Sequence, residues 1–186
     1  MTLSSLMNLI PPPAEPVYTG TRAEWDAIQD NMKIVFPKEY YEVCYVYGSG
    51  HFSGEFLIAN LFDPEARDYG FAELTRFDEA RERDPHEVPY PLYPEAGGIF
   101  PFGMDGNGNT FAWLTKGRPN QWPIVCFNSE DYSEITRHSL TEFIALLIAN
   151  SLEINRSKFW GPGSKYSMIF VPKQIARKKG RKGKRK

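Results

Sequence analysis

The sequence IFPFGMDGNGNTFAWLTKGRPNQWPIVCF, residues 99–127, contains the pattern that decides the fold. Its apolar runs are separated by two turn-forming segments, GMDGNGN at 103–109 and KGRPN at 116–120. Glycine, asparagine and proline favour tight turns, because they adopt positive φ or begin a turn without strain. Strands that are joined by such short turns pair antiparallel. We therefore expect these runs to form the middle of a mostly antiparallel sheet.

A helix is predicted after this stretch. Ser139 and Glu142 have the spacing of a capping box, in which each side chain bonds an amide of the first helical turn. Apolar residues then recur on one helical face, namely Leu140, Phe143, Ile144, Leu147, Ile148 and Leu152. This spacing of three and four residues predicts an amphipathic helix with one buried side.

Further helices are predicted before the sheet. Thr21 and Glu24 form a second capping-box pair and open a helix. Pro37 stops that helix and opens the next one, because the amide that proline lacks would have no partner in a first turn. Gly48 ends this second helix in a left-handed conformation. Another, more exposed helix is expected from Phe71 to about Arg83.

Shorter elements complete the prediction. Alternating apolar residues predict a strand over 52–58, a turn follows at Asp63-Pro64, and a short strand is indicated over 166–171. Prolines make residues 85–98 a loop or an edge segment. The expected fold class is α+β, with a central, mostly antiparallel sheet flanked by helices in a single domain.

The two ends of the chain differ in composition from its middle. Residues 1–20 end in PPPAEPVYTG, which favours extended backbone, so we expect the folded body to begin near Thr21. We place the domain at 21–171 and a basic, disordered tail at 172–186.

The net charge of −1 combines two opposite parts. All nine basic residues after Pro172 lie in a segment without acidic residues. Residues 1–170 carry 13 Lys and Arg against 23 Asp and Glu, a net charge of −10. The chain is therefore an acidic body joined to a basic tail.

Length and composition exclude several classes of protein. With 186 residues, 41% hydrophobic and 15% aromatic, the chain can build one core, which excludes a disordered or collagen-like protein. No run approaches the roughly 18 apolar residues of a membrane helix. Cys44 and Cys126 lie in apolar patterns that favour buried, reduced thiols. We expect a cytoplasmic protein, since the apolar residues 1–10 lack the basic start of a secretory signal.

Catalytic signatures are missing from the sequence. It has no CxxC, HExxH, GxxxxGK[ST] or GxSxG motif, and no GxGxxG between a strand and a helix. His51, His86 and His138 are far apart, and the residues beside them supply no metal or triad partner. We therefore expect no catalytic residue and no cofactor.

Residues 105–109 resemble a calcium loop only in part. Oxygen ligands occupy its first, third and fifth positions. Thr110 and Lys116, however, stand where a calcium loop has its glycine and its glutamate. We therefore expect a hairpin turn and no metal site.

The basic tail offers an electrostatic surface. It would attract a polyanion such as nucleic acid through salt-sensitive contacts that do not depend on sequence. No aromatic residue lies among its cations, so single-stranded bases would have no stacking platform. A solvated tail, or one that folds back on the acidic body, explains the same composition. The candidates for polyanion binding are Lys178, Lys179, Arg181, Lys182, Lys184, Arg185 and Lys186.

Negative charge is concentrated in and behind the helix predicted at 71–83. An acidic surface repels nucleic acid and steers a basic protein onto itself. An ordinary solvated helix face is the alternative for each of these acids. The candidates for partner binding are Glu73, Asp78, Glu79, Glu82 and Asp84.

Short motifs follow one another in a particular order along residues 21–150. Two helices come first, then a glycine turn, a hairpin with aromatic strands, and the helix that begins after Ser139. The positions that carry this pattern are Trp25, Pro37, Gly48, Gly50, Pro101, Gly103, Asn107, Gly108, Trp113, Gly117, Trp122, Pro123 and Phe143. In this order they resemble the SUKH superfamily, the domain of fungal cell-wall-assembly regulators and of many bacterial immunity proteins.

The resemblance implies an α+β fold and a non-enzymatic role. Bacterial members of the family are typically encoded beside a secreted or contact-delivered toxin, often a nuclease, which they neutralise by binding. It therefore implies an immunity protein with a cognate toxin as its partner. No membrane partner is expected, because the sequence lacks a long apolar run. The alternatives are a regulatory or scaffold adaptor of the cell-wall-assembly-regulator type and, more distantly, a nucleic-acid-associated protein. The insert at 85–98 and the basic tail depart from the family pattern.

Overall fold

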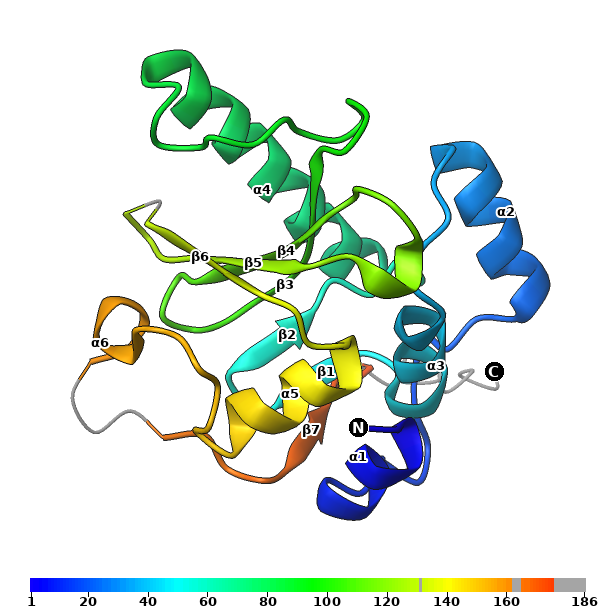
Figure 1. Ribbon diagram of the computed structural model, residues 1–186. Helices are drawn as coiled ribbons and strands as arrows, with labels where there is room; N and C mark the ends of the chain where they lie inside the picture. Colours follow the sequence, from blue (N-terminus) through cyan, green and yellow to red (C-terminus); the bar gives the residue numbers. More distant parts are fainter. Residues whose placement is uncertain (131, 162–164, 176–186) are drawn as a thin grey trace, which may run out of the picture.

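The strands of the computed structural model form one antiparallel sheet, in the order β6-β5-β4-β3-β2-β1-β7 (Figure 1). The structure describes residues 1–130, 132–161 and 165–175. The strands are β1 (Gly50–Phe52), β2 (Phe56–Ile58), β3 (Ile99–Met104), β4 (Thr110–Leu114), β5 (Ile124–Phe127), β6 (Ser133–Thr136) and β7 (Phe170–Pro172). The helices are α1 (Leu3–Leu9), α2 (Arg22–Met32), α3 (Lys38–Tyr47), α4 (Pro64–Arg83), α5 (Leu140–Ile148), α6 (Arg156–Phe159) and the 3₁₀ helix η1 (Pro119–Gln121).

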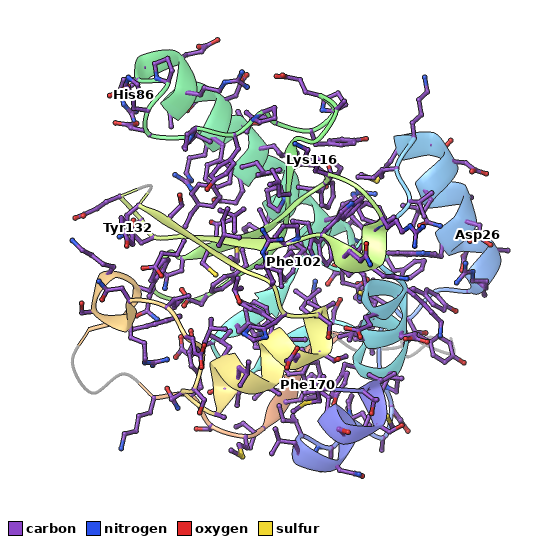
Figure 2. The ribbon with its side chains drawn as sticks, in the orientation of Figure 1. Asp26, His86, Phe102, Lys116, Tyr132 and Phe170 are labelled. Carbon is purple, nitrogen blue, oxygen red and sulfur yellow. The ribbon has the colours of Figure 1, made fainter. Side chains whose placement is uncertain are left out.

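Helices cover both faces of the sheet. The larger core lies under α1, α3 and α5, and Phe102 stacks on Trp113 near its centre, with ring centroids 4.2 Å apart (Figures 1 and 2). On the other face, Phe77 of α4 packs against Phe127 of β5 at 4.6 Å. Burial of these rings provides the main stabilisation. The predicted α+β class, with a sheet flanked by helices, is confirmed.

The central hairpin forms as the sequence predicts. Strands β3 and β4 pair antiparallel, with a register shift between Pro101 and Gly103. Gly108 adopts φ +80° in the connecting turn, a conformation that costs glycine little. Residues 85–98 contain no strand, but Val88 and Leu92 are buried against α4 and the sheet. The insert is therefore a packed loop.

The strand predicted over 52–58 is wrong, because the chain turns back inside it. Ser53 and Gly54 adopt positive φ and connect β1 to β2. Phe52, Phe56 and Ile58 are all buried, so the burial pattern continues through the turn and resembles one strand. The sequence prediction also omitted β6, whose Ile135 is 46% exposed and gives little apolar alternation.

Helix α4 begins at Pro64, well before the predicted start at Phe71. The Asp63 side chain accepts a hydrogen bond from the Glu65 amide and caps the helix. Pro64 needs no acceptor in the first turn, so the Asp-Pro pair begins a helix where a turn was expected.

The expectation that the folded body begins near Thr21 is wrong. Residues 3–9 form α1, and Leu6 and Ile10 are fully buried in the larger core. The Tyr47 hydroxyl donates to the Ile10 carbonyl at 2.7 Å. The prolines after Ile10 end this helix but do not detach it from the domain.

The two predicted capping boxes have different outcomes. At α2, the Glu24 amide donates to Thr21 Oγ1 at 3.2 Å, and the Thr21 amide donates to Glu24 Oε2 at 2.7 Å, which confirms that box. At α5, the Ser139 side chain makes no cap hydrogen bond, and Glu142 pairs with His138. This second box is wrong. The first turn of α5 is instead bonded through the Thr141 amide, which donates to a carboxylate from another helix.

That carboxylate is Glu39 of α3. Its Oε2 accepts the Thr141 amide of α5 at 2.9 Å. Glu39→Ala should lower the free energy of unfolding by about 1 kcal/mol, the usual contribution of an N-cap acceptor, whereas Ser139→Ala should change it by less than roughly 0.5 kcal/mol. Urea denaturation of both variants measures the difference. A larger loss in Ser139→Ala would show that Ser139 caps α5 in solution.

The last described strand extends the domain beyond its predicted end. Strand β7 includes Pro172, and the Lys173 amide donates to the Ser49 carbonyl at 2.8 Å. Both residues therefore belong to the folded body and not to the tail.

Candidate functional site

Helix α4 presents the predicted acidic surface. Its buried stripe consists of Ala66, Gly70, Phe77 and Ala80, which lie on one helical face against the sheet. A Cβ atom at Gly70 would lie 3.0 Å from the Ala59 Cβ atom, so glycine lets the helix approach the sheet closely. The opposite face of α4 points to solvent, with His86 beyond its outer end (Figure 2).

Three of the five predicted acids lie together on this exposed face. Asp78, Glu79 and Glu82 are all exposed, and their spacing of three and four residues puts them on one side of α4. Within residues 1–130, 132–161 and 165–175, none of them forms an ion pair. Their like charges repel one another, and no cation of the described residues pairs with them, so a cation from a partner would be attracted to them. We call these three residues the acidic row.

The other two predicted acids serve the fold. Glu73 Oε2 accepts the Thr110 hydroxyl of β4 at 2.6 Å and the Arg76 Nε at 3.0 Å, and its side chain is 21% exposed. Asp84 is the C-terminal cap residue of α4, and its Oδ1 accepts the His86 amide. The structure therefore separates Glu73 and Asp84 from the acidic row.

A groove of about 310 Å³ borders the acidic row. It lies between α4 and the insert, and its lining includes Leu74, Asp78, Leu92, Pro94 and Glu95. An apolar floor with a carboxylate on its rim fits the side chain of lysine or arginine, which has an apolar stem and a charged end.

Glu95 was not among the predicted binding residues. It lies in the proline-containing insert, and only the fold brings it beside Asp78. Its Oε1 pairs with Arg81 Nη1 at 3.1 Å, so part of its charge is compensated. Asp78 therefore supplies the open negative charge of the groove.

The Asp105 carboxylate is buried and bound by protein donors. Tyr166 Oη and Trp160 Nε1 donate to Oδ2 at 2.7 and 2.8 Å, and Asn109 Nδ2 donates to the same oxygen at 2.8 Å. The amides of Asn107 and Asn109 donate to Oδ1 at 2.9 and 3.0 Å. Burial and the Asp105 carboxylate raise the pKa of the Tyr166 hydroxyl, so it remains a donor. The turn that resembles a calcium loop thus tethers the C-terminal segment to the hairpin.

Among the described residues, the remaining reactive side chains do not gather into a site. In the part of the chain that the structure describes, no group of three or more His, Cys, Asp or Glu residues could hold a metal ion. Cys44 and Cys126 are buried and unpaired, as the sequence predicts, and burial raises the pKa of both thiols. Buried thiols with raised pKa values are poor nucleophiles.

The residues that carry the family resemblance lie in the core and in turns. Trp25, Trp113, Trp122 and Phe143 are buried. Gly48 and Gly117 adopt positive φ, and the Gly117 carbonyl accepts Trp122 Nε1 at 3.2 Å. The other members lie directly before α3 or β5, in β1 or β3, or in the turn between β3 and β4: Pro37, Pro123, Gly50, Pro101, Gly103, Asn107 and Gly108.

A second groove, of about 280 Å³, lies where α3 and α5 begin. Trp113 and Trp122 form part of its wall. Its polar groups already have partners, because Glu39 accepts the Thr141 amide and Asn120 Oδ1 accepts the Lys38 amide at 2.8 Å. We therefore regard this groove as a consequence of how the two helices are fixed.

The predicted polyanion-binding residues lie outside the described residues, namely Lys178, Lys179, Arg181, Lys182, Lys184, Arg185 and Lys186. Among the helices that the structure does describe, none has the length and apolar character needed to cross a membrane.

Comparison with known proteins agrees with the resemblance. A search of curated proteins found no match to this chain. The model of the SMI1 / KNR4 family (SUKH-1), however, matches residues 19–146, which include α2 to β6 and most of α5. Strand β7 and the residues that bind Asp105 from the C-terminal side lie beyond this match. The chain therefore belongs to the SMI1 / KNR4 family (SUKH-1).

Proposed function

We propose that this protein acts by binding, as an immunity protein that neutralises a cognate toxin with a basic active-site cleft, such as a nuclease. The observation that carries the proposal is the acidic row of Asp78, Glu79 and Glu82, which is exposed on a SUKH-1 domain and forms no ion pair with the residues that the structure describes. The protein needs no catalytic group for this role, because covering the cleft is sufficient to block it.

Electrostatics supports a partner of this kind. A nuclease cleft is basic because it binds phosphates, so a row of carboxylates can occupy the positions that phosphates would take. The groove beside the row can hold a lysine or arginine of the toxin, with its stem on Leu74 and Leu92 and its charge near Asp78. Such complementarity speeds association and determines which partner binds.

The salt dependence of association tests the proposal. Stopped-flow measurements with the purified cognate toxin should show an association rate constant that falls at least about tenfold between roughly 50 mM and 500 mM salt. A chain that lacks residues 176–186 should behave like the full chain, because the acidic row and not the tail steers the toxin. An association rate constant independent of salt would contradict the proposal.

A chromosomal survey distinguishes this role from the regulatory or scaffold role. A large toxin gene beside this one supports immunity, and its product is then the toxin to purify. If no toxin gene is adjacent and the chain captures a signalling protein from its native host, the adaptor role is correct and the immunity role is wrong.

A further inference from the structure

The edge of the sheet at β1 is filled by a segment from the C-terminal end of the chain. Strand β7 pairs antiparallel with β1, and Val171 lies opposite His51. The Ser53 amide donates to the Ile169 carbonyl at 2.7 Å, and the Lys173 amide donates to the Ser49 carbonyl at 2.8 Å. This is the geometry by which extended peptides add a strand to an exposed sheet edge.

Two side chains of the segment fit specific places. The Phe170 ring lies against Tyr47 and Phe52, with centroid distances of 5.2 and 4.9 Å. The Lys173 ammonium lies 2.7 Å from Asp63 Oδ2 and 2.8 Å from Glu65 Oε2, at the start of α4. The β1 edge thus contacts an aromatic residue and, three positions later, a lysine.

Gly50 makes room for this segment. A Cβ atom at position 50 would lie 2.4 Å from the Val171 carbonyl oxygen and 2.6 Å from the Phe170 ring. Gly50 is not among the residues with positive φ, so its backbone conformation does not require glycine. Its missing side chain is therefore explained by the strand that lies over it.

The β1 edge and the segment that occupies it belong to different parts of the chain. Ser49, Gly50, Phe52 and Asp63 lie inside the family match, which ends at residue 146, while the occupant 169–173 lies beyond it. The occupant is a short strand, and its Ile169 and Val171 are 51% and 43% exposed. Phe170 is the one side chain of the strand that packs against the larger core. Such a short edge segment, held by one ring, one lysine and a few backbone hydrogen bonds, opens at a lower free energy than the central strands.

We propose that the β1 edge is a binding site for an extended segment of a partner protein, with an aromatic residue followed three positions later by a lysine. Residues 169–173 occupy this site in cis and compete with the partner. When they leave, the carboxylates of Asp63 and Glu65 lose their cation, so the open edge attracts a basic segment. This site is separate from the acidic row and does not depend on the immunity role.

A peptide added in trans tests the proposal. In the full-length variant Phe170→Ala/Lys173→Ala, residues 169–173 should bind the β1 edge less tightly, while the edge itself is unchanged. A fluorescent peptide of residues 167–175, SMIFVPKQI, should bind this variant at least about tenfold more tightly than it binds the wild type, as measured by anisotropy. The same peptide with both substitutions should not bind.

Glycine variants supply the matched controls. Adding Gly50→Val to the double variant should abolish peptide binding, because the side chain fills the place of the strand. Adding Gly161→Ala, where a Cβ atom meets nothing within 4 Å, should leave binding unchanged. A folded double variant that fails to bind, or binding that survives Gly50→Val, would overturn the proposal. A double variant that elutes as a dimer would also overturn it, by assigning the edge to a second copy of this chain.

Hydrogen exchange of the wild type gives a second test if the double variant does not fold. The Ser53 amide, which donates to the Ile169 carbonyl, should exchange much faster than the amides between β3 and β4. Equal protection of both sets would show that the segment opens only with global unfolding, which contradicts the proposal.

Discussion

Asp105→Ala is expected to lower the free energy of unfolding by about 3–5 kcal/mol, because several buried donors lose one charged acceptor together. Trp160 Nε1 and Asn109 Nδ2 would be left in the interior beside a small cavity. The C-terminal segment would also lose its attachment to the hairpin, since Tyr166 donates to the same carboxylate. Urea denaturation followed by tryptophan fluorescence measures both effects.

Asn107→Ala is the matched control in the same turn. The Asn107 side chain is exposed, and only its backbone amide bonds Asp105. We expect this variant to lose less than roughly 0.5 kcal/mol. If Asp105→Ala were no less stable than Asn107→Ala, the carboxylate would not hold the C-terminal segment.

Reversing the charge of the acidic row should slow toxin binding strongly. In Asp78→Lys/Glu79→Lys/Glu82→Lys, three attractive charges become repulsive, so the association rate constant at low salt should fall on the order of 100-fold. Stability should change little, because all three side chains are exposed and unpaired among the described residues. Stopped-flow kinetics at several salt concentrations measures the effect.

A second triple variant separates local charge from net charge. Glu15→Lys/Glu55→Lys/Glu153→Lys makes the same change in net charge at exposed positions outside α4 and the insert. It should slow association far less, because salt screens charges that lie more than about 10 Å from the interface. Equal slowing by the two variants would mean that net charge, and not the acidic row, controls binding.

Local chemistry explains which parts of the fold could be predicted. The turn between β3 and β4 follows from its glycines and asparagines, and the box of Thr21 and Glu24 is a contact between near neighbours. The cap of α5 was missed because Glu39 and Thr141 are 102 positions apart. The role of Asp105 was missed for the same reason, since Trp160 lies 55 positions away.

The candidate site, too, depends partly on local sequence and partly on contacts between residues far apart in the sequence. Charge pattern identified the helix and the acidic row, but it could not tell which acids the fold uses. Glu73 accepts a hydrogen bond from Thr110, which lies 37 positions away in the sequence, and Asp84 is the C-terminal cap residue of the helix. Glu95 joins the groove only because the insert folds back onto α4. Spacing along a helix thus predicts which side chains share a face, and packing decides which of them stay free.

Carboxylate footprinting of the toxin complex shows directly which face is covered. The protein is labelled with a carbodiimide and an amine, alone and with saturating toxin, and modification at each acid is read by mass spectrometry. We predict that the toxin protects Asp78, Glu79 and Glu82, while Glu153 is modified equally in both samples. Unchanged modification of the acidic row in a sample where the toxin is fully bound and inhibited would contradict its role as the binding surface.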